Sequence, residues 1–177
     1  MHKDIEQILI REKQIAAKTE EIGLAIARDY ADCDLVLIGA LKGVLPFMAD
    51  LIRAIDMKLE FDFIQASSYA GTESTGVVTI KKDITVDVTG RDVIVVEDII
   101  DTGTTLDFLK GYLLEKGAKS VEIAAMLSKP DRRKVEVDVK YVGFEIPDKF
   151  VVGYGMDYNE MYRNLPYIGI LSPRVYS

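Results

Sequence analysis

Three carboxylates and three threonines follow a run of β-branched residues in the stretch VIVVEDIIDTGTTL, which covers residues 93–106. Glu97 and Asp98 come directly after the apolar run, and Asp101 follows three residues later. Carboxylates can bind a divalent cation, accept hydrogen bonds from sugar hydroxyls or remove a proton. The stretch therefore has the residue types of a ligand-binding site at the end of a strand.

The second half of this stretch has the composition of a phosphate-binding loop. Thr102, Gly103, Thr104 and Thr105 stand at the start of a predicted helix, where the first backbone amides can point at an anion. Glycine permits a tight turn and the hydroxyls add donors. The sequence has no G-x-x-x-x-G-K-[ST] motif, so this is not a Walker loop. A ligand that carries a phosphate, a ribose diol and a metal-bound diphosphate would use the whole set.

Each of these residues also has an ordinary structural interpretation. Asp and Thr are common caps at helix N-termini, and acidic residues at a strand end are often only solvated. For one residue alone, the structural interpretation is the more common one. The ordered set of strand, acid pair, third acid, glycine and threonines favours a binding site.

The elements that would position these residues are those of an α/β fold. Continuous apolar runs predict buried parallel strands at residues 34–40, 92–97 and 120–128. Apolar periodicity and helix end signals predict helices near residues 15–26, 44–55 and 104–117. This alternation favours a central parallel sheet flanked by helices, with the ligand beyond the carboxyl ends of the strands.

Two further features are expected around this core. Strands at 58–66 and 77–84 would form a long hairpin whose tip, SSYAGTESTG at 67–76, is rich in Ser, Thr and Gly and predicts a flexible loop. Short strands are expected at 139–146, 150–155 and 167–171. We expect a single domain over residues 1–177, with a core of about 30–130 and a small hood formed by the N-terminal piece and residues of about 140–177.

Composition limits the classes of partner. The net charge is −7 and the sequence pI is 4.8, and the densest basic cluster, RRK at 132–134, is interpreted as a solvated turn, so a nucleic-acid partner is not expected. The apolar region at 35–49 is interrupted by Lys42, Gly43 and Pro46, so a membrane span is not expected. The single cysteine, Cys33, and the absence of a secretory signal predict a cytoplasmic protein.

The stretch at 93–106 resembles the phosphoribosyl diphosphate signature of type I phosphoribosyltransferases. Four more segments resemble the hypoxanthine-guanine branch of that family: LIGALKGVLPFMADL at 37–51, SSYAGT at 67–72, LSKPDRR at 127–133 and IPDKFVVGYGMDYNEMYRNLPYIGIL at 146–171. The resemblance implies transfer of a 5-phosphoribosyl group to hypoxanthine or guanine, a purine salvage step that gives IMP or GMP and diphosphate. It also implies Mg²⁺ as a cofactor and a homo-oligomer, either a dimer or a tetramer.

The resemblance also implies a role for each matching residue. Phosphate and diphosphate groups would be bound by Lys42, Gly43, Asp101, Thr102, Gly103, Thr104, Thr105 and Arg163. Glu97 and Asp98 would hold the ribose hydroxyls and a magnesium ion, and Asp157 would lie near a second magnesium. Asp101 would be the general base for N7 of the purine. Lys129 would donate to the 6-oxo group, Phe150 would stack on the ring, and Val151 and Asp157 would contact its edge.

The loop residues Ser68 and Tyr69 are implied to close over the site and to exclude water. Taken alone, Lys42 fits a solvated loop, Arg163 a surface ion pair, and Phe150 a strand core. Two other functions stay open. One is a relative that prefers xanthine, because a donor to the 6-oxo group does not select the 2-position. The other is a nucleotide-sensing regulator that binds RNA or DNA, against which the net charge argues.

Overall fold

The computed structural model describes residues 3–67 and 78–176 of the chain. Within these residues, six strands form the main sheet in the order β4-β3-β2-β5-β6-β7. The strands are β2 (Leu35–Ala40), β3 (Glu60–Ser67), β4 (Thr79–Lys82), β5 (Asp92–Ile100), β6 (Ser120–Ser128) and β7 (Tyr141–Glu145). Neighbouring strands are parallel except β4, which runs antiparallel to β3. The expected α/β fold with a mostly parallel sheet is confirmed.

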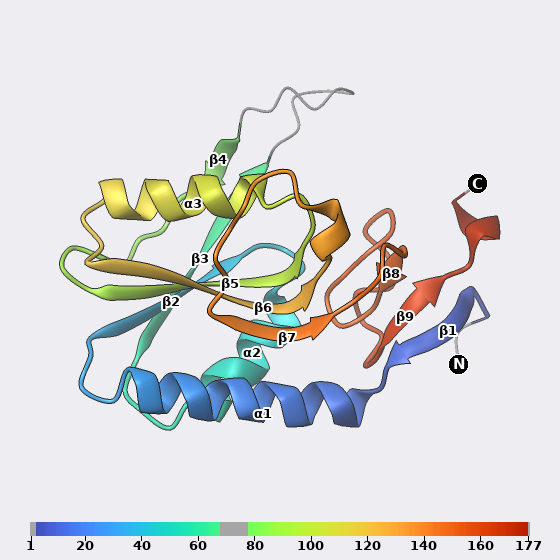
Figure 1. The fold of residues 1–177 in the computed structure, drawn as a ribbon, viewed down its shortest axis with the longest axis horizontal. Coiled ribbons are helices and arrows are strands. Elements are labelled where there is room, and N and C mark those ends of the chain that lie inside the picture. The colour runs from blue at the N-terminus through green and yellow to red at the C-terminus, as the bar shows by residue number, and fades with distance from the viewer. Residues whose placement is uncertain (1–2, 68–77, 177) are drawn as a thin grey trace.

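Helices cover both faces of this sheet, which explains the continuous apolar runs. α1 (Glu12–Asp29) and α2 (Leu45–Ala54) lie on one face, and α3 (Thr104–Glu115) lies on the other (Figure 1). All six residues of β2 are buried, as expected of a central parallel strand. On α1, the buried positions include Ile15, Ile22 and Ile26, which confirms the predicted apolar face. Pro46 lies in the first turn of α2, where a missing amide does no harm.

A second, smaller sheet forms the hood beside the main sheet. It contains β1 (Ile5–Ile10), β9 (Ile168–Leu171) and β8 (Val151–Val152) in that order, all antiparallel. Figure 1 shows these strands grouped at one side of the molecule, with both marked chain ends beside them. Strands from opposite ends of the sequence therefore pair directly in the hood.

Three boundaries differ from those expected from the sequence. β5 continues to Ile100, so Glu97 and Asp98 lie within its last part and do not follow it. Residues 141–145, expected in the hood, pair with β6 in the main sheet. The strand expected at 150–155 is only two residues long, because Gly153 and Gly155 adopt φ values of +97° and +98° that turn the chain. Short 3₁₀ helices, η1 (Pro130–Arg132) and η2 (Pro173–Val175), follow β6 and β9.

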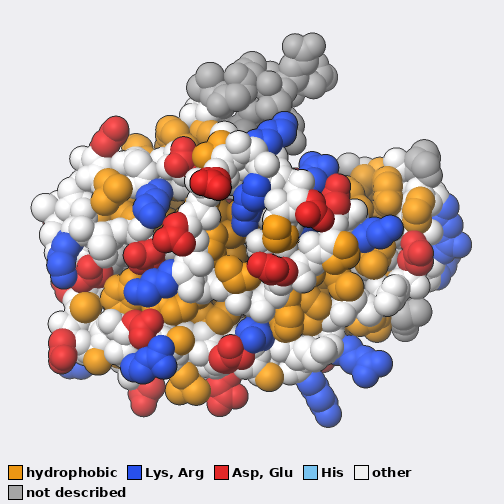
Figure 2. Space-filling view, in the orientation of Figure 1, with side chains coloured by type: hydrophobic (Ala, Val, Ile, Leu, Met, Phe, Trp, Pro, Cys, Tyr) orange, Lys and Arg blue, Asp and Glu red, His pale blue; other side chains and the backbone are white. Residues whose placement is uncertain are grey.

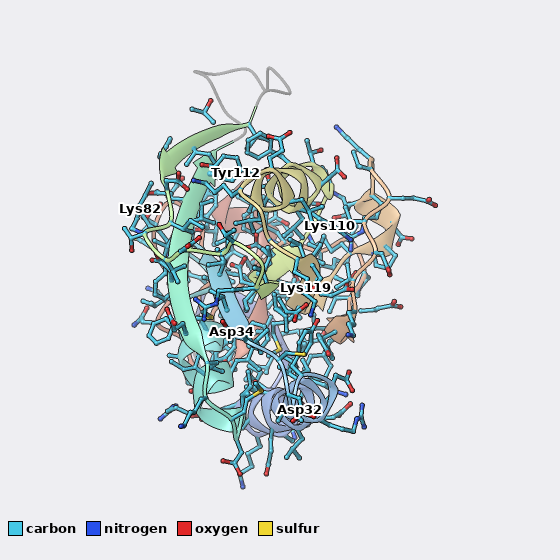
Figure 3. All side chains as sticks on the ribbon, turned by 90° about the vertical axis from the view of Figure 1, so that its left-hand side faces the viewer. Asp32, Asp34, Lys82, Lys110, Tyr112 and Lys119 are labelled. Carbon is cyan, nitrogen blue, oxygen red and sulfur yellow. The ribbon has the colours of Figure 1, made fainter. Side chains whose placement is uncertain are left out.

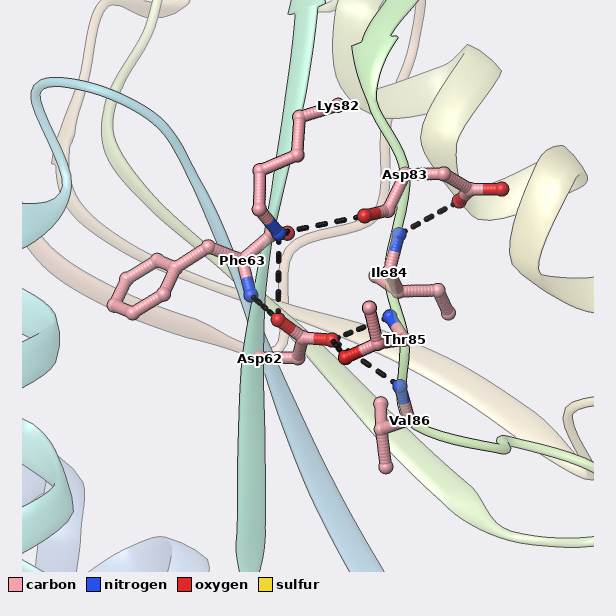
Figure 4. Close-up of polar contacts among 7 residues, drawn as sticks. All are labelled: Asp62, Phe63, Lys82, Asp83, Ile84, Thr85 and Val86. Atoms are coloured by element: carbon pink, nitrogen blue, oxygen red, sulfur yellow. Dashed lines mark hydrogen bonds and ion pairs between the residues drawn. The ribbon is translucent and has the colours of Figure 1, made fainter.

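The carboxylate of Asp62 fastens the hairpin arm to the chain that follows β4 (Figure 4). Its Oδ2 accepts hydrogen bonds from the backbone amides of Thr85 and Val86 at 2.6 and 3.1 Å and from the Thr85 hydroxyl at 2.9 Å. Its Oδ1 accepts from the Phe63 amide at 2.7 Å. Burial alone would raise the pKa of Asp62, but these hydrogen bonds outweigh it and hold the pKa well below its usual value.

We expect Asp62→Ala to lower the free energy of unfolding at neutral pH by about 2–3 kcal/mol, because several donors lose a charged acceptor. A depressed folded-state pKa adds stability above the unfolded-state pKa, and that stability is lost as the pH falls toward the folded-state value. The difference in free energy of unfolding between wild type and Asp62→Ala should therefore shrink below about pH 4. Urea unfolding from pH 3 to pH 7 measures this difference, and Asp56→Ala, at an exposed position, is the control. A difference that does not vary with pH would contradict this account.

The amino ends of the parallel strands form the end of the molecule seen in Figure 3. Arg91 donates to Asp34 at 2.7 Å and to Glu60 at 3.1 Å. Lys119 pairs with the buried Asp92 at 2.9 Å. These ion pairs join neighbouring strand starts, and none of the predicted site residues belongs to them.

The surface carries charges of both signs. On the face shown in Figure 2, acidic and basic side chains are intermixed and form no continuous basic stripe. No helix in residues 3–67 and 78–176 has the length and apolar character needed to cross a membrane.

Candidate active site

Six of the predicted site residues meet at the carboxyl ends of β5 and β6, beside the hood. A cavity of about 210 Å³ lies there. It is lined by Asp98, Ile99, Asp101, Lys129, Phe150, Val151, Met156 and Asp157. Of the six predicted site residues in this lining, all except Asp98 were predicted to bind the purine or to act as the general base. They come from the hood and from the residues that directly follow β5 and β6. The tertiary structure therefore brings together residues that are far apart in sequence.

The acid pair of β5 contacts the loop that follows β2. A Cβ built on Gly43 would lie 1.9 Å from Oδ2 of Asp98, so only glycine leaves room for this carboxylate. Burial and the Asp98 charge raise the pKa of Glu97 well above its usual value. Burial also raises the pKa of Asp98, although hydrogen bonds from Glu97 and from the Ile99 amide oppose it. A cation bound beside the pair would favour the charged form of both carboxylates, which burial disfavours.

The Lys42–Gly43 loop packs on the hood. The peptide bond between Leu41 and Lys42 is cis. The carbonyl oxygen of Gly43 contacts Gly155, whose added Cβ would lie 1.8 Å from it. Nζ of Lys42 forms an ion pair with Glu160 at 2.8 Å. The loop after β2 is thus joined to the hood both by backbone contact and by charge.

Arg163 is held within the hood by three acceptors. Its guanidinium donates to the carbonyl oxygen of Gly155 at 2.7 Å and pairs with Asp157 at 2.8 Å and Glu160 at 3.3 Å. Oδ2 of Asp157 accepts from the Glu160 amide at 2.9 Å. Glu160 therefore contacts both cations that were predicted to bind diphosphate, Lys42 and Arg163. Glu160 was not among the predicted site residues, and its place three residues before Arg163 is no signal of this contact, because residues 160–163 form no helix.

The threonine-rich loop surrounds a small cavity at the N-terminus of α3. The cavity has a volume of about 100 Å³ and is lined by residues 99–103 with Thr105 and Leu106. Gly103 is the N-cap residue, with φ of +86°, and the Thr102 hydroxyl donates to the Thr104 hydroxyl at 3.3 Å. The helix-cap interpretation of Asp101 is therefore wrong, since Gly103 occupies the cap. The N-terminus of α3 therefore borders this cavity, and the free amides of a helix N-terminus favour an anion.

Lys129 and Phe150 line the 210 Å³ cavity from different parts of the fold. Lys129 is buried at the end of β6 and lies 3.5 Å from Asp148. Phe150 is 39% exposed, so it is not a core residue. Its ring stacks on Tyr176 at a centroid distance of 5.2 Å and meets Tyr158 edge-on at 5.6 Å. Val151 is buried in β8. The exposed ring is supported by aromatic neighbours.

The basic cluster at 132–134 is not only a solvated turn, and this interpretation is corrected. Arg132 donates to both carboxylate oxygens of Asp101, from Nε at 2.8 Å and from Nη2 at 3.3 Å. Arg133 donates to the carbonyl oxygen of Asp101 at 3.1 Å. A run of basic residues does not reveal this contact, because Arg132 and Asp101 are thirty-one residues apart in the sequence.

Ser68 and Tyr69 lie outside the described residues. Among the described residues, no group of three or more His, Cys, Asp or Glu side chains is placed to hold a metal by itself. Glu97, Asp98 and Asp157 are thus not gathered into one cage. A protein that binds Mg²⁺ through one or two carboxylates, with substrate phosphates completing the shell, does not require such a cage.

A larger cavity lies elsewhere on the molecule. Its volume is about 690 Å³, and residues of α1 and α2 line it together with Tyr154 and Pro166. None of the predicted site residues belongs to its lining. Volume alone therefore does not locate the site, and the convergence of chemistry at the strand ends does.

Comparisons with known proteins agree with this geometry. A family model described as a phosphoribosyl transferase domain matches residues 3–159. The hypoxanthine-guanine phosphoribosyltransferase of Staphylococcus epidermidis is 52% identical over 100% of this chain and 99% of its own length. The enzyme of the same name from Bacillus subtilis is 51% identical, over 99% of this chain and 98% of its own.

Solved structures show the same similarity. A crystal structure of a hypoxanthine phosphoribosyltransferase from Staphylococcus aureus superposes with a TM-score of 0.96 at 49% identity, covering 100% of this chain and 97% of the other. The Trypanosoma cruzi hypoxanthine phosphoribosyltransferase, solved with the product IMP, has a TM-score of 0.93 at 36% identity and covers 99% of both chains. The chain belongs to the phosphoribosyltransferase family, within its hypoxanthine-guanine branch.

Proposed function

We propose that this chain transfers the 5-phosphoribosyl group of phosphoribosyl diphosphate to hypoxanthine or guanine, a purine salvage reaction. One observation carries the proposal: Asp101 lines both the 210 Å³ cavity and the 100 Å³ cavity. The carboxylate thus lies between a space suited to a purine and a space suited to a phosphate. Family membership and the names of the relatives support the same reaction.

The phosphoribosyl diphosphate would bind across the strand ends. The loop of residues 102–105 holds a phosphate with backbone amides and hydroxyls. Glu97 and Asp98 accept hydrogen bonds from the ribose hydroxyls. Lys42, the Gly43 backbone and Arg163 hold the diphosphate, and the two cations exchange Glu160 for phosphate oxygens when it binds.

The purine would bind between β6 and the hood. Lys129 donates to the 6-oxo group, Phe150 stacks on the ring, and Val151 and Asp157 contact its edge. In the reaction, N9 bonds to C1 of the ribose while the bond from C1 to the diphosphate oxygen breaks, and its electron pair leaves with diphosphate. Asp101 takes the proton from N7. The transferring carbon develops positive character, so positioning and electrostatic stabilisation supply most of the rate.

Magnesium fits the acid pair by its chemistry. Glu97 and Asp98 are hard oxygen ligands with raised pKa values, and a cation between them and a diphosphate would offset the repulsion. Asp157 is the acid proposed near a second magnesium. When bound, the ion would neutralise the departing diphosphate. Glu97 and Asp98 would hold the ion beside the bound substrate.

We expect a chelator in excess to lower turnover about 10³-fold, since a metal ion contributes several kcal/mol of charge stabilisation. Added magnesium should restore the activity. Calorimetry of phosphoribosyl diphosphate binding with and without magnesium gives a second measurement that is independent of turnover. Undiminished turnover and binding in excess chelator would refute the roles of Glu97, Asp98 and Asp157.

A spectrophotometric assay with phosphoribosyl diphosphate, magnesium and a panel of bases tests the proposed function. Hypoxanthine and guanine should react, whereas adenine and uracil should not. A strong preference for xanthine would reassign the chain to a xanthine-preferring relative, because Lys129 selects only the 6-position. If none of these bases gave a nucleotide, the proposed function would be overturned.

Three further parts of the proposal concern the whole molecule. We propose that residues 1–177 form one domain, that the protein works in the cytoplasm as a dimer or tetramer, and that the loop carrying Ser68 and Tyr69 closes over the bound substrates. A single cysteine, partly buried, supports a reducing compartment. Light scattering on the purified protein would measure the mass, and a monomer at working concentration would contradict the oligomer.

A further inference from the structure

We propose that Arg132 is a positioning residue that holds the Asp101 carboxylate in its reactive orientation, within a brace formed by residues 132–135. This inference rests on the proposed function, because it assigns Arg132 to the general base of that reaction. The brace begins at the last residue of η1 and continues toward β7, and the general base lies between β5 and α3. The two segments touch only in the folded chain.

The contact between Arg132 and Asp101 is a two-point contact. Nε of Arg132 lies 2.8 Å from Oδ1 of Asp101, and Nη2 lies 3.3 Å from Oδ2. A planar guanidinium that donates to both oxygens fixes the plane of the carboxylate as well as its position. Each carboxylate oxygen keeps a further lone pair. The carboxylate can therefore accept a proton from a purine while Arg132 still holds it.

The brace also holds the backbone around Asp101. Arg133 donates to the carbonyl oxygen of Asp101 at 3.1 Å, and the amides of Lys134 and Val135 donate to the carbonyl oxygen of Thr102 at 3.0 and 3.2 Å. A Cβ on Gly103 would lie 2.7 Å from the carbonyl oxygen of Val135, so the two backbones are in close contact. Backbone and side-chain contacts thus act on the same short loop.

A second acid connects the brace to the purine-binding lysine. Asp148 lies 3.6 Å from Nη1 of Arg132 and 3.5 Å from Nζ of Lys129. The charges therefore alternate in the order Asp101, Arg132, Asp148, Lys129. The two ends of this series, Asp101 and Lys129, both line the 210 Å³ cavity. The series joins the residue proposed at N7 to the residue proposed at the 6-oxo group of the same purine.

The ion pair of Arg132 and Asp101 is partly solvated, with 45% and 43% of the two side chains exposed. An exposed ion pair contributes little to stability. Its effect is expected in the reaction, where a small misplacement of a catalytic group has a large effect on rate. The structure thus predicts an arginine whose loss changes turnover far more than folding.

Arg132→Gln should lower the single-turnover rate of nucleotide formation about 10–100-fold, because the carboxylate loses its fixed orientation. The KM for phosphoribosyl diphosphate and the midpoint of thermal unfolding should change little. Arg28→Gln is the matched control, since Arg28 is an exposed arginine paired with Asp29 at 3.1 Å on α1. Arg132→Lys keeps the charge without the planar fork and should recover only part of the rate.

The double variant Asp101→Asn/Arg132→Gln separates positioning from general support of the loop. If Arg132 acts through Asp101, the double variant should be no slower than Asp101→Asn alone. A further loss of 10-fold or more in the double variant would overturn the proposal, as would a normal rate in Arg132→Gln. If Arg132→Gln does not fold, the comparison is made with Arg132→Lys, and full wild-type rate there would overturn the role of the fork. An inactive wild type would instead refute the proposed function.

Discussion

Hypoxanthine should react with a kcat/KM about 10⁴-fold higher than adenine, because a site built around a hydrogen bond to one group rejects the partner that lacks it. The ammonium of Lys129 has three donors and no acceptor. It is buried at the end of β6 and faces the purine cavity, where it meets a carbonyl of a 6-oxopurine but an amino group of adenine. Two donors facing each other leave the lysine N–H that points at the base without an acceptor, although Asp148 still lies near the ammonium.

Lys129→Met keeps the length of the side chain and removes its charge. It should lower the kcat/KM for hypoxanthine and guanine by about 10³-fold or more, with little effect on the binding of phosphoribosyl diphosphate. The constants for each base in wild type and variant measure this effect. Lys58→Met is the control, since Lys58 is exposed before β3 at the other end of the sheet. Equal use of adenine and hypoxanthine by the wild type would show that Lys129 does not select the base.

Asp101→Asn should lower kcat about 10²–10⁴-fold with a modest change in KM, because asparagine keeps the shape of the side chain and cannot accept the proton. The chemical step is isolated in a single turnover with enzyme in excess of purine. Asp131→Asn is a close control, since Asp131 is exposed in η1 beside the brace. A single-turnover rate near that of wild type would remove Asp101 from the role of general base.

The effect of Asp101→Asn should not come from lost structure. The Asp101 backbone keeps the hydrogen bond from Arg133, and the neighbouring Thr102 carbonyl keeps those from Lys134 and Val135. The asparagine oxygen can still accept a hydrogen bond from Arg132. The midpoint of thermal unfolding is therefore expected within a few degrees of wild type. A large loss of stability would mean that the rate change reports unfolding.

Local patterns in the sequence were enough to predict the elements and the class of the fold. The strands of the core are buried on both faces, so their apolar runs are continuous, as in residues 35–40 and 93–96. The helices are amphipathic, and their periodicity is visible at Ile15, Ile22 and Ile26. Because ligands bind at the carboxyl ends of parallel strands, the acids and threonines after residue 96 could be assigned to a site.

Only the tertiary structure decided which charges meet. The pairs Arg132 with Asp101 and Lys42 with Glu160 join residues 31 and 118 positions apart, and no local pattern encodes such a separation. The hood depends likewise on β1 pairing with β9, from opposite ends of the chain. The sequence by itself determined the residue types, the elements and the family of this protein. The partners of the charged side chains depend on how the sheet and the hood pack, since charge pairing is set by distance in space and not by distance along the chain.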